Sequence, residues 1–276
     1  MHIPRPEYPR PQFQRKDWLC LNGTWEFEID PADTGLARGL LERPLHERIA
    51  VPFCPESELS GIGRTDFMEA VWYRRRVEIP AEWAGAEVLL HFQAVDYEAT
   101  VWIDGVEACR HRGGFSPFTC PLHGLAEPGE AVEIVVRARD PRGMTKPGGK
   151  QSERYENHAC HYTRTTGIWQ TVWMEPVPAV HLKRPRITPD PANRCFALEL
   201  PIRENVPGYT VRALLSYNGN ELAEASAPAD GAWAPRLVLE IPEGEVHWGE
   251  PGAGRLYGIR LELRDGSGAA VDRASS

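Results

Sequence analysis

The sequence predicts an all-β protein made of two sandwich domains, and three observations support this prediction. Within residues 86–118 the apolar side chains alternate at the period of two that is typical of half-buried strands. The chain contains 25 glycines and 25 prolines, which indicates frequent turns. Strand candidates also follow one another without amphipathic helices of ordinary length between them, as in all-β folds.

The first part of the chain contains six strand candidates. Apolar residues share one face over residues 88–92 and again over residues 101–103. The pair Asp104-Gly105 follows directly, and since Asp-Gly adopts positive backbone angles readily, we expect a hairpin there. The other candidates are residues 24–29, 73–79, 132–136 and 168–174. The last is apolar on both faces, so it should be covered on both sides.

The pattern changes after about Pro176, where a proline-rich connector leads to shorter strand candidates. Their regular spacing, with turn residues between them, is typical of a smaller sandwich of about 100 residues. The pair Asn218-Gly219 predicts a second hairpin. We therefore expect one domain over residues 1–178 and another over residues 179–276. The short candidates are residues 196–200, 209–216, 237–241 and 257–263.

Charge and hydropathy exclude several classes of partner. The net charge of −8 argues against nucleic acid or an anionic membrane surface, because both favour a basic protein. No apolar run is long enough to span a bilayer, and the first residues lack the apolar core of a signal peptide. We therefore expect a soluble, cytoplasmic protein. The six cysteines form no CxxC pair, so we expect free and mostly buried thiols.

A set of motifs occurs in order across residues 7–176: EYPRPQFQRKDWLCLNGTWEFEID, VPFCPESELSGIG, VWYRRRVEIP, VDYEATVWIDG, HRGGFSPF and TGIWQTVWMEP. Together they resemble the N-terminal sugar-binding jelly roll of glycoside hydrolase family 2, the family of bacterial beta-galactosidases and beta-glucuronidases. The later segment, through GRLYGIRLELRDGSGAAVDR, resembles the immunoglobulin-like sandwich that follows in that family. The resemblance implies a jelly-roll (galactose-binding-like) β-sandwich followed by a smaller immunoglobulin-like β-sandwich.

The same resemblance implies that the catalytic TIM barrel of the family would follow Ser276. Retaining glycosidases hold two carboxylates about 5–5.5 Å apart on a rigid frame, which a barrel provides. Two local acidic pairs could substitute for them, but exposure in a loop is their simpler interpretation. We therefore expect no catalytic residue in this chain, and no turnover by the chain alone. The two pairs are Glu56 with Glu58, and Asp66 with Glu69.

The segment 137–154 contains six basic residues against two acidic ones, a net charge of +4 in an acidic chain. A long loop of this kind either reaches toward a sugar site between domains or is simply solvated. The resemblance favours the first interpretation, because Lys150-Gln151 matches the end of a Pro-Arg-Gly-Lys-Gln pattern of the family. Gly148 stands where that pattern has arginine. Lys150 is therefore a candidate substrate-binding residue.

Two further candidates lie just before the buried segment 168–174. By resemblance, Tyr162 and Arg164 help to shape the sugar pocket. The tyrosine would offer an aromatic face for ring stacking, and the arginine a fixed fork of donors for hydroxyl or carboxylate oxygens. The alternative is packing and salt bridging between domains, where arginine and aromatic residues are also enriched.

No metal or cofactor is expected. His158, Cys160 and His161 lie close together, but no second pair of ligands stands at metal-binding spacing, which favours a polar loop. The sequence also lacks a phosphate-binding glycine loop and a Gly-x-Ser-x-Gly elbow. Four of the tryptophans lie within strand patterns, which favours packing over sugar stacking: Trp25, Trp102, Trp169 and Trp173.

The sequence therefore predicts the noncatalytic part of a family 2 exo-beta-glycosidase that hydrolyses terminal beta-linked sugars. Its expected partners are the catalytic barrel and, through the parent enzyme, a beta-linked sugar or oligosaccharide; family members often form homo-oligomers through these domains. Galactoside, glucuronide and mannoside remain open as substrates. A free-standing carbohydrate-binding module would instead bind sugar without a barrel, and a structural or adhesive pair of sandwiches would bind a protein.

Overall fold

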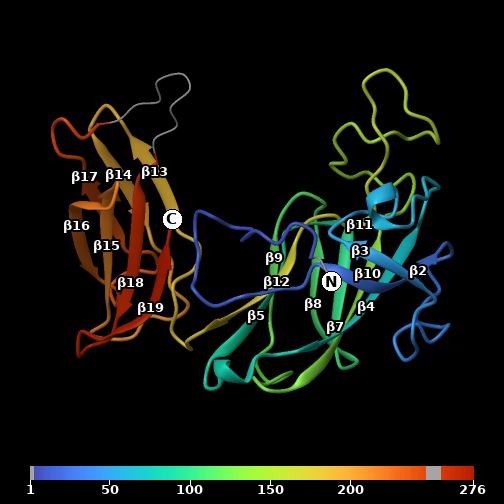
Figure 1. Ribbon diagram of the computed structural model, residues 1–276, viewed down its shortest axis with the longest axis horizontal. Helices are drawn as coiled ribbons and strands as arrows, with labels where there is room; N and C mark the ends of the chain where they lie inside the picture. The colour runs from blue at the N-terminus through green and yellow to red at the C-terminus, as the bar shows by residue number, and fades with distance from the viewer. Residues whose placement is uncertain (1–2, 247–255) are drawn as a thin grey trace. The chain divides into compact units, whose positions relative to one another are not determined.

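The computed structural model describes residues 3–246 and 256–276 as two compact units of β-structure (Figure 1). The first unit comprises residues 1–9 and 18–176, and the second comprises residues 10–17 and 177–276. The predicted boundary at residues 178 and 179 lies in the connection that leaves the last strand of the first sandwich.

The first unit is a sandwich of a six-stranded and a four-stranded sheet, joined by a small two-stranded ladder. The larger sheet has the order β3 (Glu47–Val51), β2 (Gly23–Asp30), β4 (Ala70–Glu78), β10 (Ala131–Arg139), β7 (Glu98–Ile103) and β8 (Val106–Arg112). The smaller sheet has the order β1 (Leu19–Cys20), β12 (Val172–Val177), β5 (Glu87–Phe92) and β9 (Phe118–Pro121). The ladder pairs β11 (Gly167–Ile168) with β6 (Val95–Asp96), and two 3-10 helices complete the unit: η1 (Glu58–Ser60) and η2 (Ala81–Trp83).

The core of this sandwich contains the apolar faces that the sequence predicts. Trp25 and Phe27 of β2 lie at most 1% exposed between the sheets, together with Leu90 of β5 and Val101 of β7. Their alternation with outward polar residues places one face of each strand in the core. The strand prediction for these segments and the all-β class are therefore confirmed.

The predicted strand over residues 168–174 is wrong as a single element. The structure divides it into β11, which pairs with β6, and β12, which pairs with β1. The chain thus passes from one ladder to another between residues 169 and 171, which an unbroken apolar run does not reveal. Ile168 and Trp173 are fully buried, as expected for a segment covered on both sides.

The second unit is a smaller sandwich of a three-stranded and a four-stranded sheet. The first has the order β13 (Arg186–Asp190), β14 (Cys195–Glu199) and β17 (Arg236–Glu240). The second has the order β16 (Asn220–Pro228), β15 (Thr210–Tyr217), β18 (Gly258–Arg264) and β19 (Ala270–Ser275). Leu198, Leu215 and Leu261 are central residues of its apolar core.

Both predicted hairpins are present. Asp104-Gly105 joins β7 to β8 with φ of 47° and 82°, and Asn218-Gly219 joins β15 to β16 with φ of 48° and 83°. Positive φ at both central residues is the geometry of the tight two-residue turn that matches strand twist.

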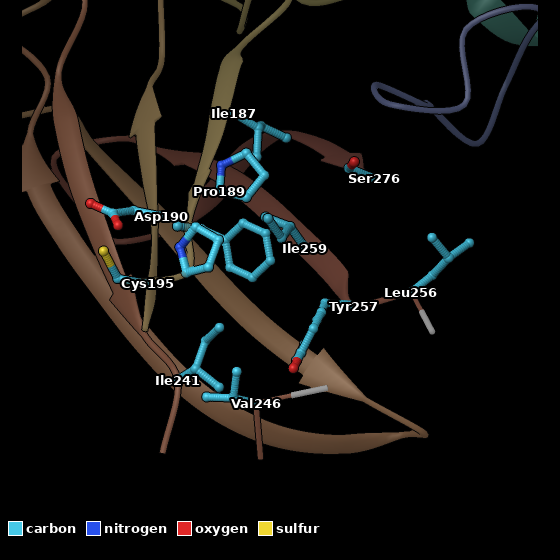
Figure 2. Close-up of a pocket in the computed structure, with 12 residues that line it drawn as sticks. Ile187, Pro189, Asp190, Cys195, Ile241, Val246, Leu256, Tyr257, Ile259 and Ser276 are labelled. Carbon is cyan, nitrogen blue, oxygen red and sulfur yellow. The ribbon is translucent and has the colours of Figure 1, made fainter. Parts of the chain in front are cut away.

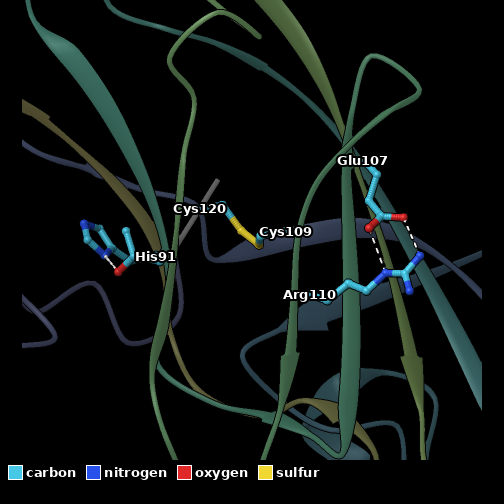
Figure 3. The surroundings of a disulfide bond; sticks show 6 residues. His91, Glu107, Cys109, Arg110 and Cys120 are labelled. Carbon is cyan, nitrogen blue, oxygen red and sulfur yellow. Dashed lines mark hydrogen bonds and ion pairs between the residues drawn. A yellow bond between two sulfur atoms is a disulfide. The ribbon is translucent and has the colours of Figure 1, made fainter.

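The prediction of six free thiols is wrong. Cys109 of β8 and Cys120 of β9 form a disulfide with a Cα–Cα distance of 5.7 Å, which lies in the usual range for such bonds (Figure 3). The two strands belong to different sheets, so only the closure of the sandwich brings these cysteines together. Of the free cysteines, Cys160 is exposed, while Cys20, Cys54 and Cys195 are half-buried.

None of the helices within the described residues has the length and hydrophobicity that a membrane span requires.

Candidate functional site

The loop between β10 and β11 carries all three predicted substrate-binding residues. Figure 1 shows it as yellow-green coil at one end of the first sandwich, beside β11. Two segments of the loop lie against each other: Tyr162 N–H donates to Lys150 O at 3.0 Å, and Ser152 N–H donates to Tyr162 O at 2.7 Å. The structure thereby brings Lys150 and Tyr162 together.

Tyr162 presents a half-exposed aromatic ring on this loop. The residue is 47% exposed, and its hydroxyl accepts a hydrogen bond of 3.2 Å from the backbone N–H of Lys150. Gly149 passes close by with φ of 62°, and a Cβ at that position would lie 2.8 Å from the tyrosine hydroxyl. The ring is therefore held in place at its hydroxyl end, while part of its surface stays open to a ligand.

Arg164, in contrast, is 7% exposed and faces the protein. Its guanidinium lies 3.9 Å from the centroid of the Phe67 ring and donates to the backbone oxygens of Ser152, Arg154 and Thr65. Burial lowers the pKa of Arg164, and the negative charge of Glu56 offsets part of that effect. These contacts use the donor fork to tie the loop to the segment around residue 65.

A second tie lies beneath the loop, and sequence reasoning missed it. The carboxylate of Asp96, 1% exposed, accepts a hydrogen bond of 2.7 Å from Gln151 Nε2, while Gln151 Oε1 accepts from the backbone N–H of Thr165 at 3.0 Å. Burial raises the pKa of Asp96, against the lowering effect of the Gln151 hydrogen bond. The pattern that singled out Lys150 contained the signal, since its neighbour Gln151 makes the buried contact.

One glycine and one lysine near Asp96 complete this anchor. A Cβ on Gly114 would lie 2.5 Å from Asp96 Oδ1, so the carboxylate needs a residue without a side chain there. Lys146 of the loop forms an ion pair with Asp140 and lies 5.7 Å from the centroid of the Tyr97 ring. Burial lowers the pKa of Lys146, and the charge of Asp96 works in the opposite direction.

Glu56 was expected in a solvated loop, and this expectation is wrong. The residue is 7% exposed, and its Oε2 accepts a hydrogen bond of 3.2 Å from the backbone N–H of Thr166. Burial raises the pKa of Glu56, although the hydrogen bonds from Thr166 counteract it. Burial also raises the pKa of the neighbouring Cys54 to about 12. Glu56 supports the end of the loop, a contact that depends on residues far away in the sequence.

The other acidic candidates form no paired site with Glu56. Glu58 and Asp66 are exposed, and Glu69 is half-buried, with Oε1 accepting from the backbone N–H of Arg142 at 3.2 Å. Their surroundings match the simpler interpretation of loop carboxylates. That no catalytic carboxylate pair lies in this chain stays a prediction.

His158 and His161 stack on each other, with ring centroids 4.6 Å apart, next to the exposed Cys160. His158 Nδ1 also lies 3.3 Å from the hydroxyl of Ser152. Within residues 3–246 and 256–276, no group of three or more histidine, cysteine, aspartate or glutamate side chains is placed to hold a metal ion.

Each unit also contains a hollow. A polar one of about 500 Å³ lies under the β10–β11 loop and is lined by Phe67, Asp140, Lys146, Gln151 and Arg164, among others. An apolar one of about 270 Å³ lies in the second unit, where Figure 2 shows Ile187, Ile241, Tyr257 and Ile259 around it. Among its described lining residues, Asp190 accepts hydrogen bonds from the backbone N–H and the side-chain amide of Asn193.

Comparison with known proteins gives beta-glucuronidases and a beta-galactosidase among the relatives. No family model matches the chain. A beta-glucuronidase of Paenibacillus borealis is 25% identical over 270 residues, which cover 91% of this chain and 43% of the relative. A beta-glucuronidase of Canis lupus familiaris is 32% identical over 135 residues, covering 44% of this chain and 20% of the relative. A beta-galactosidase of Thermoanaerobacter pseudethanolicus is 24% identical over 181 residues, covering 64% of this chain and 22% of the relative.

The chain is a homologue of beta-glucuronidases and beta-galactosidases of the glycoside hydrolase family 2 type. The resemblance predicted from the ordered motifs is thereby confirmed. The solved structure of Ruminococcus gnavus beta-glucuronidase matches this chain with a TM-score of 0.72 at 20% identity, covering 96% of this chain and 45% of that one. At that identity the likeness shows a shared fold. The chain spans less than half the length of these relatives.

Proposed function

We propose that the chain forms the noncatalytic β-sandwich part of a glycoside hydrolase that removes terminal beta-linked glucuronic acid. A jelly-roll domain over residues 1–178 and an immunoglobulin-like domain over residues 179–276 would support an active site that a TIM barrel supplies. One observation carries the proposal: the P. borealis beta-glucuronidase matches 91% of the chain, so the likeness extends over both units. A free-standing binding module or an adhesive pair of sandwiches has no comparable support.

The geometry of the β10–β11 loop supports a place for it at the rim of that active site. The backbone N–H of Lys150 donates to the hydroxyl of Tyr162, and both residues are exposed. A ring face and a cation on one loop suit a uronic acid. Hydrogen bonds from Arg164 to the backbone of the loop and from Gln151 to the buried Asp96 hold the loop in place. Binding residues held by such supports keep their geometry, which a sugar pocket requires.

The test compares this chain with the longer product of the same reading frame. Both would be assayed with chromogenic beta-glucuronide, beta-galactoside and beta-mannoside substrates. We expect hydrolysis by the longer protein alone, and of the glucuronide above the other two. Replacing Tyr162 by alanine in the longer protein should raise KM more than it lowers kcat, because ring stacking is already present in the bound ground state. Hydrolysis by the 276-residue chain would contradict the proposal.

Two parts of the prediction concern the cellular setting and stay predictions: association into a homo-oligomer and a cytoplasmic location. The disulfide bears on the second, because such bonds persist mainly in oxidising compartments.

A further inference from the structure

Part of the outer face of the six-stranded sheet is covered by the segment between β2 and β3. The segment between β2 and β3 lays Leu40 and Leu45 over Trp72 and Trp102, which stack on each other with centroids 5.6 Å apart. Leu36, 51% exposed, marks the edge of this cover. Beyond it a hollow of about 520 Å³ lies over β10, β7 and β8. We call it the sheet groove, and it is lined by Leu36, Glu98, Ala99, Thr100, Trp102, Glu107, Arg110, His111, Arg112, Arg137 and Arg139.

The strand register explains why the face is hollow at this point. Thr100 of β7 lies opposite Arg137 of β10 on one side and opposite Arg110 of β8 on the other. Residues directly opposite each other on neighbouring strands extend from the same face of a sheet. The short side chain of Thr100 therefore forms the floor of the groove, and the long side chains of Arg137 and Arg110 form its two walls. The strands that carry the walls are two strand spacings apart, roughly 10 Å, which admits one sugar ring.

The sheet groove is positively charged in an acidic protein. Its lining contains four arginines against the carboxylates of Glu98 and Glu107, while the whole chain has a net charge of −8. Asp33, in the segment between β2 and β3, pairs with Arg137 and Arg139. When Asp33 is counted as well, the four arginines still outnumber the three carboxylates. This local excess favours an anionic ligand.

The outer wall keeps donors available. Arg110 uses Nε and Nη2 for two hydrogen bonds of 2.7 Å to Glu107, as Figure 3 shows, and Arg112 uses Nε for Glu98 at 3.0 Å. A guanidinium has five N–H donors, so each of these pairs leaves others for a ligand. The two side chains are 72% and 61% exposed, so a ligand can reach them without any opening of the fold.

We propose that the sheet groove is a noncatalytic binding site for a sugar that carries a carboxylate. The carboxylate would accept hydrogen bonds from Arg110 and Arg112, because a guanidinium matches a carboxylate in shape and charge. The ring would lie on Thr100 and the edge of Trp102, against Leu36, which supply one hydroxyl and an apolar surface. The site lies wholly on the first sandwich and does not depend on a barrel.

Isothermal titration calorimetry on the 276-residue chain tests this site. The probes are a disaccharide with a terminal beta-linked glucuronic acid and, as the neutral comparison, cellobiose. We expect the acidic disaccharide to bind at least about tenfold more tightly than cellobiose, a difference of about 1.4 kcal/mol. Its affinity should also fall as salt is raised from low ionic strength, because exposed charges are screened.

Three variants locate the binding. The double variant Arg110→Gln and Arg112→Gln should weaken it at least about tenfold. Thr100→Glu should abolish it, because a carboxylate between the two walls occupies the floor and pairs with the arginines itself. The matched control is Arg236→Gln in the second unit, an arginine 79% exposed that pairs with Glu199 at 3.0 Å, and it should leave binding unchanged.

Several outcomes would overturn the inference: no binding of the acidic disaccharide by the unaltered chain, equal binding of cellobiose, or unchanged binding in the groove variants with thermal unfolding intact. Loss of binding with Tyr162→Ala but not with the arginine variants would place the sugar on the β10–β11 loop instead. Because the measurement uses no hydrolysis, it separates this site from the proposed function, which fails or succeeds on the activity of the longer protein.

Discussion

In each of the two sandwiches, one residue on a strand lies between arginines on the two neighbouring strands. The arginines behave differently in the two cases. In the first, Thr100 lies between Arg137 and Arg110 on the neighbouring strands. In the second, Glu262 of β18 lies between Arg212 of β15 and Arg273 of β19.

The residue in the middle decides what the arginines do. Around Glu262 they converge: Arg212 Nη1 and Arg273 Nε each lie 3.4 Å from its carboxylate, and Arg264 adds Nε at 2.9 Å. Arg212 also uses Nε and Nη2 for two hydrogen bonds of 2.6 Å to Glu224. The carboxylate is 11% exposed, and the face is filled. Around Thr100 no such acceptor exists at the centre, so the arginines turn to acids at the margins and a groove remains. A single position on the central strand therefore separates a structural face from one that can bind a ligand.

The largest difference that we expect between the two hairpins comes from the disulfide. Cys109 ties β8 to β9, whereas no disulfide holds β15 or β16 among the described residues. Removing a bond that closes a loop of 11 residues should lower the free energy of unfolding by about 2–3 kcal/mol. Urea unfolding of Cys109→Ser, followed by tryptophan fluorescence, measures this.

Cys160→Ser is the matched control for that experiment, because Cys160 is exposed and free, and it should change stability by less than about 0.5 kcal/mol. A count of six reactive thiols in the denatured, unreduced protein, in place of four, would contradict the pairing. It would also remove a feature that is typical of proteins in oxidising compartments.

The turns should respond alike in the two hairpins. Gly105 and Gly219 have φ of 82° and 83°, and a Cβ added to either would meet no atom within 4 Å. Replacement by valine should therefore cost about 1–2 kcal/mol in each case, from backbone strain alone. Thermal unfolding measures both, with Gly231→Ala as the control, because Gly231 is equally uncrowded but has no positive φ. A clearly larger loss in one hairpin would mean that its turn also makes tertiary contacts.

The smallest expected effect concerns the response to pH. Burial works to raise the pKa of Glu262, but hydrogen bonds and charges of Arg264 and Arg212 outweigh it, so the pKa lies below its ordinary 4.5. The stabilisation is complete above pH 4.5 and is lost as the pH falls through the lower value in the folded state. For Glu56 the pKa is raised by burial, so stability falls as the pH rises above 4.5.

Two isosteric variants separate these opposite slopes. Glu262→Gln should reduce the loss of stability below pH 4.5, and Glu56→Gln should reduce the decline above it. Denaturation at a series of pH values between 3 and 8 gives both slopes. The control is Glu199→Gln, a half-buried residue whose carboxylate forms an ion pair with the exposed Arg236. Parallel profiles for Glu56→Gln and the unaltered protein would show that Glu56 is solvated.

Much of the fold could be predicted from short-range patterns. Asp104-Gly105 and Asn218-Gly219 form the expected turns, and the inward faces of residues 24–29 and 88–92 lie in the core. These features depend on neighbours within a few residues or on one strand period.

The candidate site was predicted only in part. Lys150 and Tyr162 do lie together, but Arg164 faces the protein, and the supporting residues Gln151, Asp96 and Glu56 were not selected. Each supporting contact joins residues that are distant in sequence, as when Glu56 accepts from the backbone of Thr166. The identity of a residue does not show whether it will be buried, and burial decides its role here.

What the sequence determined by itself is the alternation of each strand and the place of each tight turn, because both follow from the backbone and from adjacent side chains. Which strands become neighbours was decided by the tertiary structure. The cysteines of β8 and β9 meet only when the two sheets pack, and Thr100 lies between Arg137 and Arg110 only because β7 inserts between β10 and β8. Such pairings depend on the burial of the whole core, a sum over many residues that no short segment contains.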